Sequence, residues 1–189
     1  VITTDYFDEF ILENGLQYVI DSELSDDEIL SEFVASRLPE GLISSLKTYL
    51  KTVDTPLAIR SSSKLEDSNY QPFAGVYSTY MIPLVENRDQ MLRMLDKAIK
   101  SVYASVFYNG SRTYIQTTGN LQSEEKTAIV IQNICGSEHE GLYYPLLSGV
   151  GRSVNFYPID NESTEDGIVN MVLGLGKSVV EGGKTLRFN

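Results

Sequence analysis

The chain has 189 residues, of which 42% are hydrophobic and 22% charged, so it can form one sizeable globular domain or two small lobes. A formal net charge of −11 argues against a general nucleic-acid binder, which needs a cationic surface to displace counterions from phosphates. The single cysteine, Cys135, excludes an internal disulfide and a cysteine-based zinc site, and no apolar run approaches the roughly 20 residues of a membrane span. We therefore expect a cytoplasmic protein with no nucleic-acid or membrane partner.

Helical patterns dominate the first third of the chain. Thr4 can cap a helix that Asn14-Gly15 ends. Ser25-Asp-Asp-Glu28 is a capping box in front of a second helix, which Pro39 ends. Apolar residues at helical spacing predict a third helix over residues 42–50.

Two short strands and the longest helix follow. Pro56 to Arg60 and Gly75 to Ile82 are predicted strands. Asn87 starts a long helix with a continuous apolar stripe, and Asn109-Gly110 ends it.

Strand patterns dominate the last third. Residues 127–134, TAIVIQNI, form a β-branched run typical of a buried strand. Residues 148–151, SGVG, are a plausible hairpin turn, and residues 167–174 and 184–188 are further strand candidates. Helices in the first part of the chain and a mostly antiparallel sheet in the last part predict an α+β fold.

A P-loop and a catalytic histidine are both disfavoured by the local sequence. Residues 174–178, GLGKS, resemble the end of a P-loop, but Met171 stands where that motif needs a glycine. The one histidine, His139, lies between two glutamates in a polar turn, so a solvated loop residue is its default interpretation.

The stretch from Leu57 to Tyr80 is the most informative part of the sequence. An arginine at the end of a buried strand offers a planar fork of donors that matches phosphate oxygens, and the serines beside it add further donors. The turn Phe73-Ala-Gly75 could bring backbone N–H groups close to a second phosphate. A phosphate cradle is one interpretation; a polar loop whose Arg60 pairs with Glu66 or Asp67 is the other.

The same stretch resembles the ATP-binding domain of the phosphoenolpyruvate synthase and pyruvate phosphate dikinase family. The family pattern A-V-R-S-S-A-T-A-E-D-x-x-x-A-S-F-A-G-Q-x-E-T-Y aligns without a gap. The matching positions are Ala58, Arg60, Ser61, Ser62, Glu66, Asp67, Phe73, Ala74, Gly75, Thr79 and Tyr80. Similar segments elsewhere extend the resemblance over nearly the whole chain, and among them are AIVIQNICG and LGLGKSVVEGG.

The resemblance implies an ATP-grasp-like fold with a helix-rich lobe over residues 1–125 and a strand-rich lobe over residues 126–189. Such enzymes bind ATP with Mg²⁺ between two lobes. They transfer the nucleotide's β-phosphoryl group to a histidine on a separate swivelling domain, which carries it to pyruvate in a barrel domain. Phosphoenolpyruvate synthase converts pyruvate, ATP and water to phosphoenolpyruvate, AMP and phosphate.

The resemblance also implies which residues of this chain contact the nucleotide. Arg60 is the implied catalytic residue, which stabilises charge on the transferring phosphates, with Ser61 beside it. The implied phosphate loop contains Gly75, Val76, Tyr77 and Thr79, and the implied adenine border contains Gln132, Asn133 and Ile134.

Departures from the pattern leave alternatives open. Ser78 replaces a glutamate, and Lys177 replaces an acidic residue. The family's ATP-contacting lysine is expected before Val1, and its magnesium ligands are expected after Asn189. We therefore expect a catalytically inert piece of a longer phosphotransferase. Pyruvate phosphate dikinase, another dikinase with a swivelling histidine, or a non-catalytic nucleotide-binding module are the alternatives.

Overall fold

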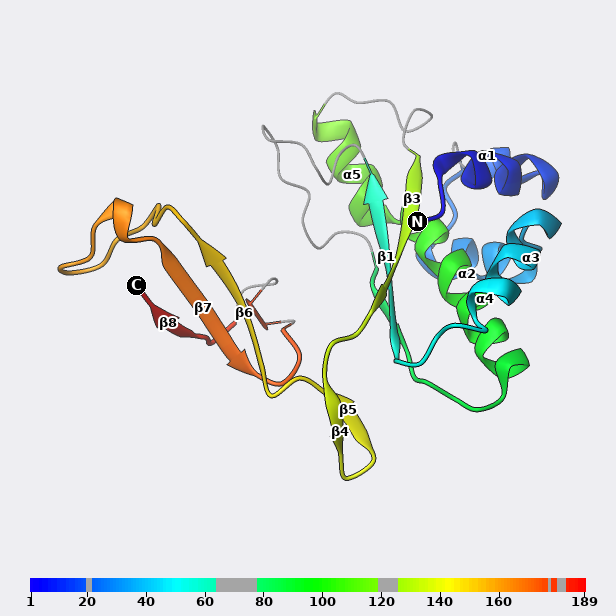
Figure 1. The fold of residues 1–189 in the computed structure, drawn as a ribbon. Helices are drawn as coiled ribbons and strands as arrows, with labels where there is room; N and C mark the ends of the chain where they lie inside the picture. The colour runs from blue at the N-terminus through cyan, green and yellow to red at the C-terminus, as the bar shows by residue number, and fades with distance from the viewer. Residues whose placement is uncertain (20–21, 64–77, 119–125, 177, 180–182) are drawn as a thin grey trace. The chain divides into compact units, whose positions relative to one another are not determined.

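The computed structural model describes residues 1–189 except 20–21, 64–77, 119–125, 177 and 180–182 (Figure 1). The chain separates into two compact units, Val1–Ile134 and Cys135–Asn189. The strand over residues 127–133 pairs with the first strand of the chain and belongs to the first unit. Both helices and antiparallel sheets are present, so the predicted α+β class is confirmed.

The first unit contains five α-helices, a 3₁₀ helix and three strands within its described residues. In chain order they are α1 (Thr4–Glu13), η1 (Leu16–Val19), α2 (Asp26–Ala35), α3 (Glu40–Tyr49), β1 (Leu57–Ser63), β2 (Tyr80–Ile82), α4 (Arg88–Ser105), α5 (Asn109–Thr118) and β3 (Thr127–Asn133).

Local capping explains where several of these helices begin. The predicted capping box of α2 is present: the Ser25 N–H donates to Glu28 Oε2 at 2.8 Å, and the Glu28 N–H donates to Ser25 Oγ at 3.4 Å. The predicted cap of α4 is also present, since Asn87 Oδ1 accepts from the Gln90 N–H at 3.0 Å. The N-cap of α1 is Thr3 rather than Thr4.

Two predicted helix ends are wrong. The second helix ends at Ala35, and Pro39 instead caps the start of α3. The long helix ends at Ser105, and Asn109 begins α5 instead of marking a stop. Proline is compatible with the first turn of a helix, where no backbone donor is needed, so it starts a helix as readily as it follows one.

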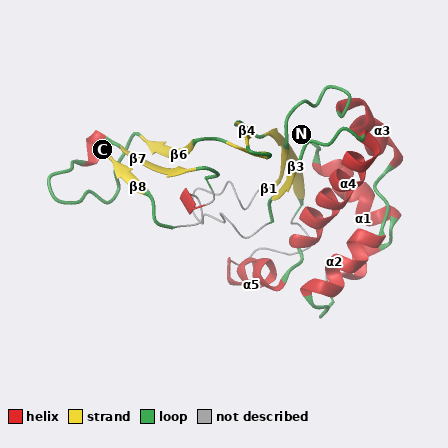
Figure 2. Ribbon diagram, turned by 90° about the horizontal axis from the view of Figure 1, so that it is seen from below, coloured by secondary structure: helices red, strands yellow, loops and turns green. Residues whose placement is uncertain are grey.

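The three strands form an antiparallel sheet in the order β2-β1-β3. Because side chains alternate across a strand, the register sorts them into two faces. The core face packs against the helices, with α4 on all three strands and α1 on β3 (Figure 2). Its members include Leu57, Ile59, Ile82 and Ile129, all buried.

The outer face of this sheet consists of the alternate residues. It contains Ala58, Arg60 and Ser62 from β1, Met81 from β2, and Ala128, Val130 and Gln132 from β3. The predicted strand end at Arg60 is therefore wrong: β1 continues through three serines, which pair with β3 as far as Ser63 and Thr127. Of the predicted strand over residues 75–82, β2 covers Tyr80–Ile82, and residues 75–77 lie outside the described residues.

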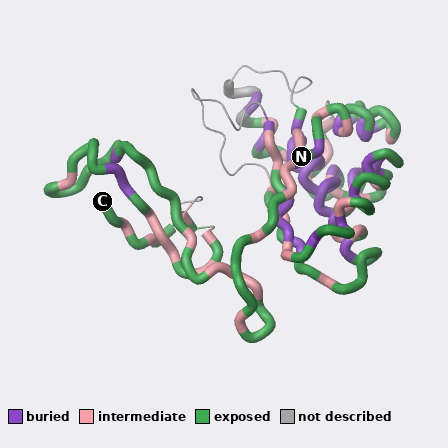
Figure 3. The backbone as a smooth tube through the Cα atoms, in the orientation of Figure 1, coloured by how far each residue is buried: buried purple, intermediate pink, exposed green. Residues whose placement is uncertain are grey.

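An aromatic cluster fills the space between the helices and the core face. Phe7, Phe10, Phe33, Tyr103 and Phe107 are each at most 4% exposed. The rings of Phe7 and Tyr103 meet edge to face with centroids 5.0 Å apart, and those of Phe10 and Phe33 are 5.7 Å apart. This core fixes the sheet that carries Arg60 (Figure 3).

The second unit is built from strands. A hairpin of β4 (Ser137–His139) and β5 (Leu142–Tyr144) precedes a three-stranded antiparallel sheet in the order β6-β7-β8. Its strands are β6 (Leu147–Arg152), β7 (Ile168–Leu173) and β8 (Leu186–Phe188), and η3 (Thr164–Asp166) lies between β6 and β7.

The predicted hairpin turn at residues 148–151 is wrong, because these residues lie within β6 and pair with β7. The turn of the β4–β5 hairpin is at Glu140 and Gly141, where φ is 52° and 83°. The glycine suits this left-handed backbone because it has no Cβ. Within the described part of the chain, no helix has the length and apolar character needed to cross a bilayer.

Candidate nucleotide-binding site

Arg60 lies in the middle of β1, on the outer face of the first sheet. Strands β2 and β3 flank β1, and Arg60 pairs with Val130 of β3, one residue beyond the last β1–β2 pair at Ile59 and Tyr80. Its neighbours Ile59 and Ser61 belong to the core face, and Arg60 itself is exposed. The register, in which Arg60 lies opposite Val130, places its side chain on this outer face.

Gln132 is the hydrogen-bond partner of Arg60. Arg60 Nη1 donates to Gln132 Oε1 at 3.3 Å, although the two residues are 72 positions apart in sequence. In the described part of the chain, no carboxylate lies within ion-pair distance of this guanidinium. The guanidinium of Arg60 therefore contacts a neutral group, and no described carboxylate neutralises its positive charge.

The three residues of the predicted adenine border lie at the end of β3 and just after it. Gln132 and Asn133 pair with Ala58 and Leu57, and both are exposed. The Ile134 N–H donates to Pro56 O at 2.9 Å, so this donor already has a partner inside the protein. A contact between Ile134 and a purine would have to use another of its groups.

The other predicted nucleotide contacts are not among the described residues of the outer face to which Arg60 belongs. The Ser61 side chain lies on the core face, opposite to Arg60, and is half-buried. Thr79 is exposed and immediately precedes β2. Gly75, Val76 and Tyr77 lie outside the described residues, as do Glu66 and Asp67. Their predicted roles stay predictions.

Ser105 is a residue that the sequence did not single out. It is fully buried in the last turn of α4, where its hydroxyl donates to Val102 O at 2.7 Å and accepts from the Ser78 N–H at 3.4 Å. It thereby ties Ser78, two residues before β2, to the helical core. The sequence feature that could have indicated this role is a serine within the apolar stripe of the long helix.

Comparison with known proteins identifies the domain. The family described as "Pyruvate phosphate dikinase, AMP/ATP-binding domain" matches residues 1–186. The chain belongs to this family.

Two curated relatives of this AMP/ATP-binding domain are much longer than the chain. The uncharacterized phosphotransferase YvkC of Bacillus subtilis (strain 168) is 30% identical over 185 residues, which are 98% of this chain and 20% of the relative. The phosphoenolpyruvate synthase of Aeropyrum pernix is 23% identical over 204 residues, which are 96% of this chain and 23% of the relative. The chain thus spans between a fifth and a quarter of the relatives it matches.

The outer face around Arg60 offers hydrogen-bond donors of the kind that phosphate oxygens accept. Its exposed guanidinium carries a full charge and five N–H donors, and no described carboxylate competes for them. Among the described residues, no three His, Cys, Asp or Glu side chains gather into a metal site. The described residues therefore offer donors for phosphate and no assembled ligand set for Mg²⁺.

A shallow, open hollow of about 360 Å³ lies on the second unit of the domain. Arg152, Asp166, Val169 and Phe188 are among the residues that line it. It shares no residue with the predicted nucleotide contacts. Arg60 on its rigid strand has the chemistry that an anionic ligand needs, so we take its face as the candidate site.

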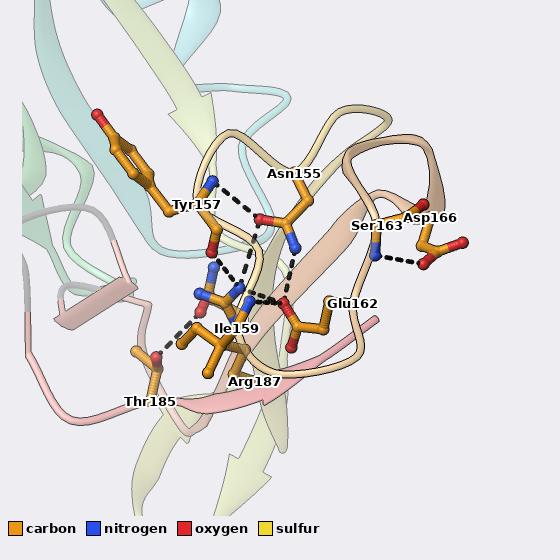
Figure 4. A network of polar contacts seen from close by, with 9 residues as sticks. Asn155, Tyr157, Ile159, Glu162, Ser163, Asp166, Thr185 and Arg187 are labelled. Carbon is orange, nitrogen blue, oxygen red and sulfur yellow. Dashed lines mark hydrogen bonds and ion pairs between the residues drawn. The ribbon is translucent and has the colours of Figure 1, made fainter.

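The second unit also holds a polar network around Glu162 (Figure 4). Glu162 Oε2 accepts from Arg187 Nη2 at 2.5 Å, from Asn155 Nδ2 at 2.7 Å and from the Ile159 N–H at 3.1 Å. The hydrogen bond from Arg187, followed by that from Ile159, lowers the pKa of Glu162 from 4.5 to about 2. The network ties the segment between β6 and β7 to β8.

Proposed function

We propose that this chain is the ATP-binding, ATP-grasp-like portion of a phosphoenolpyruvate synthase-like phosphotransferase. In the reaction proposed, pyruvate, ATP and water give phosphoenolpyruvate, AMP and phosphate. The β-phosphoryl group passes first to a histidine on a separate domain of the same protein and then to pyruvate, and the γ-phosphoryl group passes to water. The name of the Aeropyrum pernix relative supports this reaction.

The observation that carries the proposal is the exposed Arg60 on the outer face of the sheet, whose guanidinium has no carboxylate partner among the described residues. Charge develops on phosphate oxygens during phosphoryl transfer, and a fixed guanidinium stabilises it without reorganising. Under this proposal Arg60 contacts the transferring phosphates. Ser61, Gly75, Val76, Tyr77 and Thr79 complete the phosphate side, and Gln132, Asn133 and Ile134 border the adenine. Mg²⁺, bound by residues beyond those described, would add positive charge at the phosphates when present.

The test is Arg60→Ala in the full-length protein, with Arg93→Ala as the matched control. Arg93 is an exposed arginine of α4, so both variants remove one positive charge from the first unit. We expect Arg60→Ala to lower kcat/KM for phosphoenolpyruvate formation by roughly 10²-fold or more and Arg93→Ala to leave it nearly unchanged. Equal turnover in the two variants would refute the role of Arg60.

Product analysis separates this reaction from that of a dikinase that uses phosphate as its second acceptor. Release of inorganic phosphate from ATP, in equal amount to phosphoenolpyruvate, supports water as the second acceptor. Formation of pyrophosphate would assign the chain to a pyruvate phosphate dikinase instead. Residues 1–189 alone are expected to form no phosphoenolpyruvate, which the same assay measures.

A further inference from the structure

We propose that Gln132 is a positioning residue for Arg60: its side-chain amide holds the guanidinium in the orientation that meets phosphate. This inference rests on the proposed function, since it assigns a second residue to the same site. It gives the side chain of Gln132 a role separate from any contact that its backbone makes with adenine.

The register of the sheet brings the two side chains together. Gln132 on β3 lies directly opposite Ala58 on β1, and Arg60 lies two residues further along β1 on the same outer face. Diagonal neighbours of this kind are within reach of long side chains. The Ala58 side chain is a single methyl group, so nothing bulky stands opposite Gln132, and its Oε1 reaches Arg60 Nη1 at 3.3 Å.

The neutrality of the amide distinguishes this pair from another arginine contact in the same chain. Arg187 pairs with the Glu162 carboxylate at 2.5 Å and also donates to Tyr157 O, so its charge is matched inside the protein. The amide of Gln132 accepts a hydrogen bond from Arg60 and adds no negative charge. An arginine held in this way keeps its full attraction for an anion.

Holding the side chain also lowers the entropic cost of binding. A free arginine side chain samples many rotamers, and part of this conformational entropy is lost when it engages a phosphate. The backbone of Arg60 is already held by its pairing with Val130 of β3. A hydrogen bond from its guanidinium to Gln132 restricts the side chain as well, so less freedom remains to be lost in the transition state.

Two variants of Gln132 separate positioning from charge, and both are made in the full-length protein. Gln132→Ala removes the acceptor and is expected to lower kcat/KM about three- to tenfold, since the contact is exposed and joins a neutral group to a charged one. Gln132→Glu keeps an acceptor but adds a negative charge beside Arg60, and we expect a loss of about tenfold or more. The control is Gln90→Glu, the same charge change at an exposed residue of α4.

A double-mutant cycle shows whether Gln132 acts through Arg60. If it does, Gln132→Ala lowers kcat/KM in the wild-type background and has little further effect in the Arg60→Ala background. Equal effects in the two backgrounds would overturn the inference while leaving the proposed function intact. No effect of Arg60→Ala itself would overturn the proposed function instead.

A measurement without turnover completes the test. In ¹⁵N-arginine-labelled protein, the Arg60 Nε–Hε order parameter is expected to fall in Gln132→Ala and to stay at the wild-type value in the Gln90→Glu control. An unchanged order parameter in Gln132→Ala would show that the amide does not hold the guanidinium, and the inference would fail even if activity fell.

Discussion

The two units of the chain are stabilised in different ways. In the first unit, one face of the sheet and five helices enclose buried aromatic and aliphatic side chains. In the second unit, Ile168 is the one apolar residue of the described segments that is buried. One face of the β6-β7-β8 sheet consists of Leu147, Gly149, Gly151, Val169, Met171, Leu173, Leu186 and Phe188, and five of these side chains are 39–79% exposed.

The difference shows which interactions hold each unit together. Burial of apolar surface is the main favourable term in folding, and the first unit has an extensive core of this kind. A small sheet with an exposed apolar face gains little from burial, so backbone pairing and the Glu162 network carry more of the stability of the second unit. Core substitutions should therefore damage the first unit, and polar substitutions should damage the second.

The largest expected effect is in the aromatic cluster. Phe10 is fully buried, with ring centroids 5.7 Å from Phe33 and 5.5 Å from Tyr103. Phe10→Ala is expected to lower the free energy of unfolding of the first unit by about 3–5 kcal/mol, because it removes the ring and leaves a cavity. Denaturant unfolding followed by far-UV circular dichroism measures this change. Leu12→Ala on the same helix is the control, since Leu12 is 71% exposed. Similar losses in both variants would contradict a core centred on Phe10.

The second prediction concerns acid. The folded pKa of Glu162 lies at about 2, below its ordinary value of 4.5. The ionised carboxylate therefore contributes its full stabilisation above about pH 4.5, and this stabilisation is lost as the pH falls toward 2. The protection factors of residues 153–166, which correct amide hydrogen exchange for its intrinsic dependence on pH, should fall over this range in the wild type.

Glu162→Gln should remove that dependence on pH. At pH 7 we expect exchange in residues 153–166 to be faster by about an order of magnitude, with no change in the first unit. The control is Glu165→Gln, because the Glu165 side chain is exposed and its hydrogen bond to Ser163 is made by its backbone N–H. Unaltered exchange in Glu162→Gln would show that backbone pairing alone holds the segment.

The smallest expected effect is a gain in stability. Tyr103 is fully buried, its hydroxyl has no hydrogen-bond partner among the residues that the structure describes, and burial raises the pKa of this phenol well above its usual value. Tyr103→Phe removes the unpaired group and keeps the ring, so the first unit should gain about 1 kcal/mol in its free energy of unfolding. Thermal unfolding measures this gain, and Tyr157→Phe serves as the control because Tyr157 is 81% exposed. A loss of stability in Tyr103→Phe would indicate that the hydroxyl has a partner in solution.

Local signals predicted the helices better than the strands. The capping box at Ser25 and Glu28 and the cap at Asn87 are encoded within four residues, and both are present. The serines that continue β1 and the glycines within β6 have low strand propensity, and only pairing with distant partners keeps them in sheets. Such pairing depends on tertiary structure, so a single sequence does not reveal it.

The difference between local and tertiary signals also explains which parts of the site could be predicted from the sequence. Arg60 stood out because its chemistry and the surrounding motif are local. The contact with Gln132 joins residues 72 positions apart and depends on the register of β1 with β3. The anchoring of Ser78 by Ser105 likewise crosses from a segment before β2 to a helix. Neither contact has a signature within one stretch of sequence.

The central position of β1 constrains how this domain can vary in evolution. Neighbouring residues of the strand point to opposite faces, and Ile59 is fully buried beside the exposed Arg60. Deleting one residue between Leu57 and Arg60 would turn the guanidinium toward the aromatic cluster and an apolar side chain toward solvent. Substitutions at exposed positions of β1 can be accepted one at a time, whereas single-residue insertions or deletions there would remove the arginine from the surface. Length changes among relatives should therefore fall outside this strand.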